Sequence, residues 1–288
     1  MICIICNPAA GNGRARKEGV KIENLLRQKK KDCRLLMTEH PGHATDLARQ
    51  SLADAPEMVL SVGGDGTALE VASGLLGSMV PLGIIPAGTG NDFIKTIGVP
   101  KQPEAALEFA LSHPPRKTDA GEMNGKLFLN EIGTGFDVSV LDYAARAKKY
   151  CRGLLPYLYG VLQTLFRFRS IPITFSVDGG ESMTLDAFVA GAANGGMIGG
   201  GIPIAPEAKA DDGLLDVVIV EKVDRKKLIS RLIGLMQGKI LSFPETHFYR
   251  ASSVSFSAPN MRVNVDGEIV GEKAVSARIL PGALMICR

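Results

Sequence analysis

The sequence predicts two domains: an N-terminal α/β domain with a mostly parallel sheet over residues 1–119, and a C-terminal, mainly antiparallel β-sandwich domain over residues 120–288. The chain has 288 residues, whereas single domains usually have about 100 to 200. Its first part alternates short apolar runs with helical patterns, which is typical of parallel sheets. Its second part changes to an alternation of apolar and polar side chains, which indicates antiparallel strands.

The elements of the N-terminal domain follow one scheme, in which a short apolar run precedes a turn with glycine and then a helical pattern. Strands are predicted at residues 1–6, 58–62 and 81–85. Helices are predicted at residues 14–30, at 43–52, after Gly66 and at 104–111. In a sheet built this way, ligands are expected at the carboxyl ends of the strands.

The C-terminal domain is predicted from short runs in which apolar and polar side chains alternate. Residues 173–177 and 183–188 flank a turn at residues 178–180, so they predict a hairpin. Further strands are expected around Val254 and Phe256 and at residues 262–265, 275–279 and 284–286. A helical insertion is expected at about residues 139–168. The sequence leaves open whether the last strand returns to the N-terminal domain.

The composition restricts the class of protein and its location. The net charge is +3, from 33 Lys and Arg against 30 Asp and Glu, which does not predict nucleic-acid binding. The five cysteines are scattered and odd in number, which favours a reducing compartment over a secreted disulfide framework. The first strand is not preceded by the pattern of a signal peptide, so we expect a cytoplasmic protein.

Each predicted strand of the N-terminal domain is followed by a glycine loop, at residues 7–13, 63–67 and 86–92. Glycines let a backbone approach a phosphate closely, and the N-terminus of a following helix favours negative charge. Asp65 stands between two glycines at a helix start, where a carboxylate either caps the helix or coordinates Mg²⁺ beside phosphates. Neither the ordinary P-loop pattern nor the Rossmann glycine pattern is present. We expect the three loops to bind phosphate along one sheet edge.

Gly63-Gly-Asp-Gly-Thr67, followed by Ile85-Pro-Ala-Gly-Thr-Gly-Asn-Asp92, resembles the catalytic domain of the diacylglycerol kinase and sphingosine kinase family, including its soluble bacterial lipid kinases. The resemblance continues through residues 7–11, Thr38, and residues 130–136, 199–201, 205–206, 212–213 and 266–268. It implies a fold like that of NAD kinases and diacylglycerol kinases. It also implies a lipid kinase that uses ATP and Mg²⁺ to phosphorylate a lipid hydroxyl, with diacylglycerol and its product phosphatidic acid as the first choice.

The resemblance also implies which residues bind the nucleotide. These are Asn7, Pro8, Ala9, Ala10, Gly11, Thr38, Gly64, Asp65, Gly66, Thr67, Ala68, Leu69, Glu70 and Thr89. Within this set, Asp65 would serve the Mg²⁺ and phosphate site. Leu69 departs from the family pattern, which usually has Asn two residues after the Thr of the glycine motif.

Asp266-Gly-Glu268 matches the family's catalytic base motif. The resemblance implies that Glu268 takes the proton from the lipid hydroxyl and that Asp266 is its metal-linked neighbour. The residues alone also predict a β-hairpin turn at Asp-Gly, and the two interpretations are compatible. A second, structural Mg²⁺ is implied at Asp212 and the backbone oxygen atoms of Lys209 and Leu214.

Basic residues gather at residues 27–34 and 146–152. In the second segment Arg146, Lys148, Lys149 and Arg152 precede an apolar and aromatic stretch that ends near residue 169. Such a mixture suits reversible contact with a membrane surface, where the lipid acceptor would be reached. The alternative is a solvated helix face that covers the β domain. The oligomeric state is not specified, and a homodimer is one option.

Two other functions compete with a lipid kinase. An NAD kinase shares the Gly-Gly-Asp-Gly loop, but the loop at residues 85–92 and the basic aromatic insertion argue against it. A non-catalytic regulator that binds nucleotide or lipid would fit the departure at Leu69. The presence of Asp65, Asp266 and Glu268 together favours an enzyme.

Overall fold

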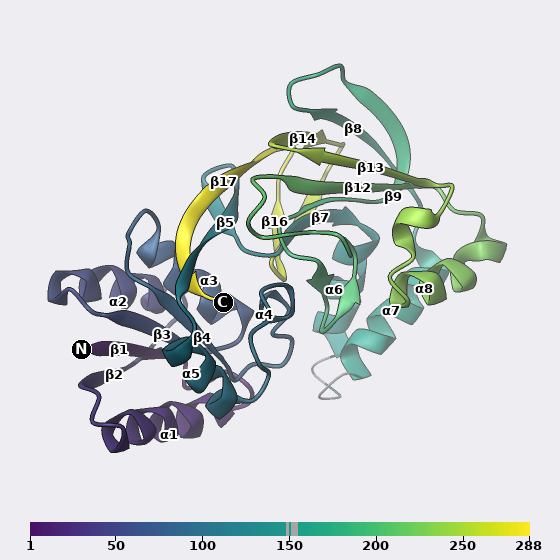
Figure 1. Cartoon of the computed structure of the whole chain (residues 1–288). Coiled ribbons are helices and arrows are strands. Elements are labelled where there is room, and N and C mark those ends of the chain that lie inside the picture. The colour runs from purple at the N-terminus through teal and green to yellow at the C-terminus, as the bar shows by residue number, and fades with distance from the viewer. Residues whose placement is uncertain (148–149, 151–154) are drawn as a thin grey trace. The chain divides into compact units, whose positions relative to one another are not determined.

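A computed structural model describes residues 1–147, 150 and 155–288 (Figure 1). The chain divides into two compact units: unit 1 is Met1–Ala120 with Pro281–Arg288, and unit 2 is Gly121–Leu280. The end of the last strand, which the sequence left open, therefore belongs to unit 1. Two strands, β5 (Pro115–Met123) and β17 (Ala274–Cys287), contribute residues to both units.

Unit 1 is built on a parallel sheet in the order β4-β3-β1-β2. Its strands are β1 (Ile2–Cys6), β2 (Cys33–Met37), β3 (Met58–Gly63) and β4 (Leu82–Pro86). The end of β17 joins this sheet, because Ile286 pairs in parallel with Leu82 of β4. Every residue of β1 and β4 is buried, as expected for strands covered on both faces. β2 was not predicted, because as an edge strand it is only partly buried and carries the exposed Arg34.

Helices cover both faces of this sheet. In Figure 1, α2 and α3 lie on one face, and α1 and α5 lie on the other. The helices of unit 1 are α1 (Arg14–Gln28), α2 (His43–Ser51), α3 (Asp65–Leu75), α4 (Phe93–Thr96) and α5 (Pro103–Ser112), with a 3₁₀ turn at Leu52–Asp54. The four predicted helices are confirmed with small shifts at their ends, since each buries one apolar stripe.

Unit 2 is mainly antiparallel, which confirms the predicted β-sandwich class. Its strands run in the order β16-β15-β7-β9-β8-β14-β17, and β12 pairs with both β9 and β13. The strands are β6 (Lys126–Phe128), β7 (Glu131–Gly135), β8 (Ile171–Val177), β9 (Met183–Ala193), β10 (Met197–Ile198), β11 (Ile202–Pro203), β12 (Leu215–Glu221), β13 (Thr246–Ala251), β14 (Ser253–Ser257), β15 (Arg262–Val265) and β16 (Glu268–Gly271). The separate strands predicted at 275–279 and 284–286 are one strand, β17.

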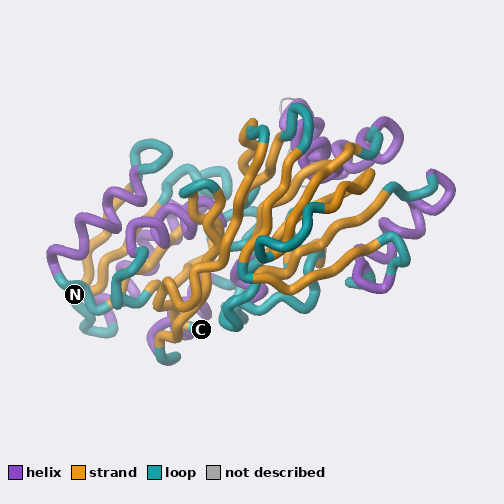
Figure 2. The backbone as a smooth tube through the Cα atoms, turned by 90° about the horizontal axis from the view of Figure 1, so that it is seen from above, coloured by secondary structure: helices purple, strands orange, loops and turns teal. Residues whose placement is uncertain are grey.

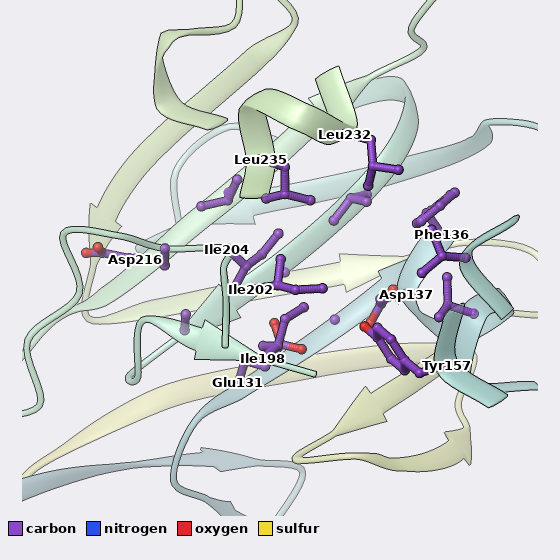
Figure 3. Close-up of a pocket in the computed structure, with 18 residues that line it drawn as sticks. Glu131, Phe136, Asp137, Tyr157, Ile198, Ile202, Ile204, Asp216, Leu232 and Leu235 are labelled. Atoms are coloured by element: carbon purple, nitrogen blue, oxygen red, sulfur yellow. The ribbon is translucent and has the colours of Figure 1, made fainter. Parts of the chain in front are cut away.

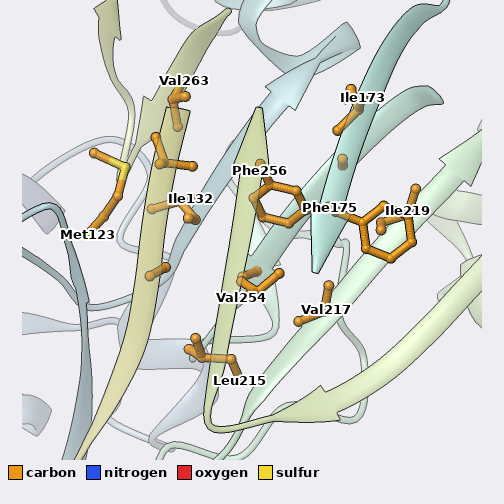
Figure 4. Close-up of a cluster of buried hydrophobic side chains, with 14 of the residues drawn as sticks. Met123, Ile132, Ile173, Phe175, Leu215, Val217, Ile219, Val254, Phe256 and Val263 are labelled. Carbon is orange, nitrogen blue, oxygen red and sulfur yellow. The ribbon is translucent and has the colours of Figure 1, made fainter. Parts of the chain in front are cut away.

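The core of unit 2 is made of side chains from these strands. Phe175 of β8 and Phe256 of β14 are opposite each other in the register and are both almost fully buried. Val217 of β12, Ile132 of β7 and Val263 of β15 belong to the same buried cluster (Figure 4). In β8 and β14, which the alternating pattern predicted, the alternation therefore corresponds to one face packed in this core.

Three helices complete unit 2: α6 (Phe136–Ala147), α7 (Leu155–Arg167) and α8 (Leu228–Met236), with 3₁₀ turns at Arg225–Lys227 and Ile240–Ser242. The insertion predicted at 139–168 corresponds to α6 and α7, while residues 148–149 and 151–154 lie outside the described residues. α8 was not predicted. None of the helices in the described ranges is long and apolar enough to span a membrane.

Candidate active site

The three glycine loops of unit 1 are in direct backbone contact. The N–H groups of Ala87 and Gly88 donate to the carbonyl oxygen of Gly63, at 2.7 and 3.0 Å. A Cβ atom added at Gly88 would lie 2.4 Å from Cα of Gly64, and one added at Gly11 would lie 2.2 Å from the carbonyl oxygen of Ala87. A side chain at either glycine would thus push two loops apart. The predicted meeting of the loops at one sheet edge is confirmed.

Asp65 is the carboxylate at the centre of this junction. It is the first residue of α3, and its Oδ1 accepts the N–H groups of Asp92 and Phe93 at 2.7 and 3.2 Å. Burial raises the pKa of Asp65, the Phe93 N–H group opposes this rise, and the nearby carboxylate of Asp92 adds to it.

Gly90 has no side chain and so leaves space beside the carboxylates of Asp65 and Asp92. A Cβ atom there would lie 3.1 Å from Oδ2 of Asp65 and 3.4 Å from Oδ2 of Asp92. Lys95 contacts Oδ1 of Asp92 at 2.5 Å, so one cation already lies beside the pair. Two partly desolvated carboxylates that face a glycine form an oxygen-rich place of the kind that Mg²⁺ prefers. Asp65 therefore fits the metal and phosphate role that the resemblance implies.

The other predicted nucleotide-binding residues are all in unit 1, with different exposure. Ala9, Gly66 and Thr89 are exposed; Asn7, Pro8, Ala10, Gly11, Gly64 and Leu69 are half-buried; and Thr38, Thr67 and Ala68 are buried. Glu70 has another contact, because its Oε2 accepts the N–H group of Ala44 at 3.1 Å and so holds the start of α2. Arg14, which the sequence did not single out, donates to the carbonyl oxygen of Gly88 at 3.1 Å.

In unit 2, Asp266 and Gly267 form the two-residue turn between β15 and β16. Both have positive φ, 46° and 95°, which confirms the predicted hairpin turn. The Asp266 carboxylate accepts three backbone N–H groups, from Leu129 at 2.6 Å and from Asn130 and Glu131 at 2.9 Å each. It therefore fixes the start of β7.

Glu268 is the first residue of β16, and its side chain is exposed. It pairs across the hairpin with Val265. The turn thus presents Glu268 to solvent on a strand whose base is fixed through Asp266. Its role as a base stays a prediction.

Unit 2 also contains an apolar cavity with a volume of about 50 Å³ (Figure 3). Leu232 and Leu235 of α8 lie on one side of it, and Glu131 and Asp137 lie on the other. Its other lining residues are Gly133, Phe136, Val140, Tyr157, Val161, Val189, Gly191, Ala193, Ile198, Ile202, Ile204, Ala205, Asp216 and Val218. A second cavity of about 60 Å³ shares part of this wall, including Phe136, and extends toward Leu228 and Phe243.

Three carboxylates line the first cavity. Oε1 of the buried Glu131 accepts the side-chain N–H of Asn264 at 3.1 Å. Neither oxygen of Asp137 has a hydrogen-bond partner among the described residues, and burial raises its pKa to about 6, although the nearby Val138 N–H and Asn264 lower it in part. Burial also raises the pKa of Asp216 to about 6, against the lowering effect of Arg250. The cavity is thus apolar with polar groups at defined points, as ligand pockets are.

These acidic residues have only weak signals in the sequence. Asp137 is the second residue of α6, two positions after the end of β7, and Asp216 is a lone carboxylate in the apolar run of β12. Nothing in the spacing of the three residues indicated that they line one cavity, because they come from three separate elements.

The guanidinium group of Arg250 lies beside the implied structural metal site at Asp212. Oδ1 of Asp212 accepts the N–H group of Leu214 at 3.0 Å, and Oδ2 pairs with the guanidinium of Arg250. Among the described residues there is no group of three or more His, Cys, Asp or Glu side chains that could hold a metal ion. Lys209, Asp212 and Leu214 as a metal site therefore stay a prediction.

The two basic segments, residues 27–34 and 146–152, differ in how many of their residues the structure describes. At residues 27–34, three side chains are paired: Arg27 with Glu23, Lys29 with Glu108, and Arg34 with Asp54. In the segment 146–152, Lys148, Lys149 and Arg152 lie outside the described residues. The guanidinium of Arg146 lies over the ring of Tyr143, 5.6 Å from its centroid.

Comparison with known proteins gives matches over the whole chain. Residues 1–123 match the diacylglycerol kinase catalytic domain, and residues 130–288 match the YegS C-terminal NAD kinase beta sandwich-like domain. A diacylglycerol kinase of Mycobacterium tuberculosis is 31% identical over 293 residues, which cover 100% of this chain and 94% of that protein. A probable lipid kinase YegS-like of Pseudomonas aeruginosa is 34% identical over 260 residues, 87% of this chain and 82% of that protein.

A solved structure is similar to this chain over nearly its whole length. The structure of a putative diacylglycerol kinase from Bacillus anthracis has a TM-score of 0.80 and 26% sequence identity. The match covers 99% of this chain and 96% of that chain.

Proposed function

Because the chain belongs to the diacylglycerol kinase-like family of lipid kinases, we propose that it transfers the γ-phosphoryl group of ATP, with Mg²⁺, to the hydroxyl group of diacylglycerol. The observation that carries this proposal is the junction of three glycine loops around Asp65 in unit 1. Loops of this kind offer backbone N–H groups to phosphates and admit close approach, because they have few side chains.

The nucleotide end of the site uses residues of unit 1. Helix α1 begins directly after the first glycine loop and α3 begins within the second, so their N-termini favour phosphate groups there. Arg14 adds a guanidinium at the start of α1. Bound Mg²⁺ would neutralise charge on the phosphates, as in other phosphoryl transfers. Asp65 is the residue that would hold it.

The acceptor end is proposed in unit 2. The first apolar cavity suits an acyl chain. Because the second cavity adjoins it at Phe136, the two cavities together suit a lipid that carries two acyl chains. Asp137 and Glu131 would accept hydrogen bonds from polar groups of the lipid. Both cavities are narrow, so a long acyl chain would require α7 or α8 to move outward.

Glu268 is the proposed general base. As an exposed carboxylate on a fixed hairpin it can accept the proton of the lipid hydroxyl while the oxygen attacks phosphorus. Asp266 fixes the hairpin to β7, and its role as the metal-linked neighbour of Glu268 stays a prediction. We further propose a cytoplasmic protein with reversible membrane contact through residues 146–169. The apolar side chains Leu158, Leu162 and Phe166, exposed on one side of α7, support that contact.

The test is a transfer assay with radiolabelled ATP and Mg²⁺. The acceptors are diacylglycerol, sphingosine, ceramide, other lipid alcohols and NAD, each in its own reaction. We expect label in diacylglycerol. Label in NAD would favour an NAD kinase, and no label would favour a non-catalytic binder.

Two substitutions test the assigned roles. Glu268→Gln and Asp65→Asn should each lower turnover by about 100- to 10,000-fold without unfolding the protein. Glu181→Gln and Asp46→Asn are matched controls at exposed positions and should leave turnover unchanged. Near-normal turnover of a site variant would remove the role given to that residue.

A further inference from the structure

Helix α8 carries apolar side chains over one broad face, of which one part is directed into unit 2 and the adjacent part is exposed. Leu228, Leu232 and Leu235 line the cavities of unit 2. Ile229, Ile233 and Met236 are 61%, 54% and 58% exposed. These three follow the spacing i, i+4 and i+7, so they form one outward stripe. A helix at the surface of a globular protein normally has polar residues on that side, so the stripe indicates contact with an apolar phase.

The residues before α8 add positive charge beside this stripe. Lys222, Arg225, Lys226 and Lys227 are all exposed. Lys227 has a carboxylate oxygen of Glu245 at 3.9 Å. For the other three, the part of the chain that the structure describes offers no carboxylate within 4.0 Å. In the basic run at residues 27–34, by comparison, carboxylates pair with Arg27, Lys29 and Arg34.

The turn that carries these charges is ordered. The side chain of Asp224 accepts the N–H group of Lys226 at 2.9 Å and so caps the 3₁₀ turn Arg225–Lys227, which runs directly into α8. The positions of the basic residues relative to the apolar stripe are therefore fixed by local structure. Residues 222–236 are called the α8 element below.

We infer that the α8 element docks on the surface of a lipid bilayer that contains anionic lipids. The apolar stripe would enter the boundary of the acyl chains, and the basic residues would face the anionic headgroups. The inference rests on the proposed function, since a membrane lipid as acceptor requires that the enzyme reach the bilayer. It goes beyond the basic segment at residues 146–152, because α8 lies in another part of the sequence.

A bilayer fits the α8 element better than a second copy of the chain. Two copies that meet through this surface would bring Lys222, Arg225 and Lys226 of each copy together, and like charges oppose such contact. The inner side of α8 lines the cavities proposed for the acyl chains. A docked α8 would then be the wall between the bilayer and those cavities, and its outward movement would let a lipid enter without crossing water.

The first test measures vesicle binding without ATP, so its result does not depend on kinase activity. Vesicles of phosphatidylcholine, with and without phosphatidylglycerol, are floated with three proteins: wild type, Lys222→Gln/Arg225→Gln/Lys226→Gln, and Ile229→Gln/Ile233→Gln. Controls are Lys101→Gln/Lys126→Gln/Lys273→Gln and Val20→Gln, which change exposed residues elsewhere.

We expect wild type to prefer vesicles with phosphatidylglycerol. The charge variant should lose about fivefold in affinity per residue, roughly 100-fold in all, and most of its salt dependence. The stripe variant should bind weakly to both vesicle types, and the controls should bind as wild type. Wild-type affinity of both α8 variants would overturn the inference. So would a dimer of the wild type, seen by sedimentation, that the stripe variant abolishes.

A second measurement needs no substitution. Hydrogen exchange of the wild type is compared with and without phosphatidylglycerol vesicles. We expect slower exchange at residues 222–236 when vesicles are present. Slower exchange confined to other surfaces, such as residues 27–34, would contradict docking through α8. If both tests succeed while no lipid is phosphorylated, the proposed function fails and the docking surface stands.

Discussion

Asp137 is a carboxylate held in an apolar cavity without a hydrogen-bond partner among the described residues. Burial raises its pKa from 3.8 to about 6. The folded protein therefore keeps this proton in a pH range where the unfolded chain releases it. The free energy of unfolding then falls as pH rises from about 4 to 6 and is constant above that range. Glu131 and Asp216 line the same cavity, and Asp216 adds a change of the same sign.

The substitution Asp137→Asn removes this ionisation at nearly constant volume. We expect the free energy of unfolding to rise by about 1 to 3 kcal/mol near neutral pH and to be unchanged below about pH 4. Urea unfolding across this pH range checks this expectation, with Asp46→Asn as the control. A variant less stable than wild type at neutral pH would show that the charged form is stabilised by a contact not seen here.

How well a residue could be assigned from sequence depended on its local motif. Asp65 was identified because it lies between glycines at a strand end, and the contacts of its loop involve neighbours in two other glycine loops. Asp137 and Asp216 have no such local signature. Their importance comes from burial in a cavity that three sequence-distant elements enclose, and no spacing rule expresses that.

At the scale of elements, the hairpin β15–β16 depends on one side chain. Asp266 accepts the N–H groups of Leu129, Asn130 and Glu131, so it ties the turn to the start of β7. Replacing it with Ala leaves three N–H groups without this acceptor. We expect Asp266→Ala to lower the free energy of unfolding by about 2 to 3 kcal/mol, since partly buried donors are left unsatisfied.

Glu268→Gln is the comparison for this prediction, because Glu268 is exposed in the same hairpin. It should remove activity with a change in stability below about 0.5 kcal/mol. Thermal unfolding of the two variants measures the difference. Equal stability of Asp266→Ala and wild type would mean that water replaces the carboxylate, and the fixing role given to Asp266 would be wrong.

The elements that the sequence predicted are those with a clear pattern. Strands β1, β3 and β4 are continuous apolar runs because helices cover both faces of their sheet. β12 was missed because it is buried almost throughout and shows no alternation. α8 (Leu228–Met236) was also missed, although its apolar side chains lie within one face of the helix.

At the scale of the whole molecule, the chain passes between its units twice, through β5 and β17. Residues 281–288 complete unit 1: Ile286 pairs with Leu82, and the N–H group of Gly282 donates to Asp119 at 2.7 Å. Deletion of residues 281–288 should therefore loosen β4 and weaken ATP binding. Hydrogen exchange should become faster at residues 82–86 and change little at residues 171–177. Unchanged protection of β4 would show that the final strand is dispensable for unit 1.

The two-domain class was predictable because the change of periodicity near residue 119 is local in sequence. The return of the chain end to unit 1 was not predictable, since an apolar run fits an edge of either sheet equally well. Only the pairing of Ile286 with Leu82 distinguishes the two placements.

The last strand also sets an order of events during synthesis. A ribosome delivers residues 1–120 first, yet the sheet of unit 1 lacks its β17 edge until residues 281–288 have been synthesised. Unit 1 would thus gain this edge only after residues 121–280 of unit 2 have been made.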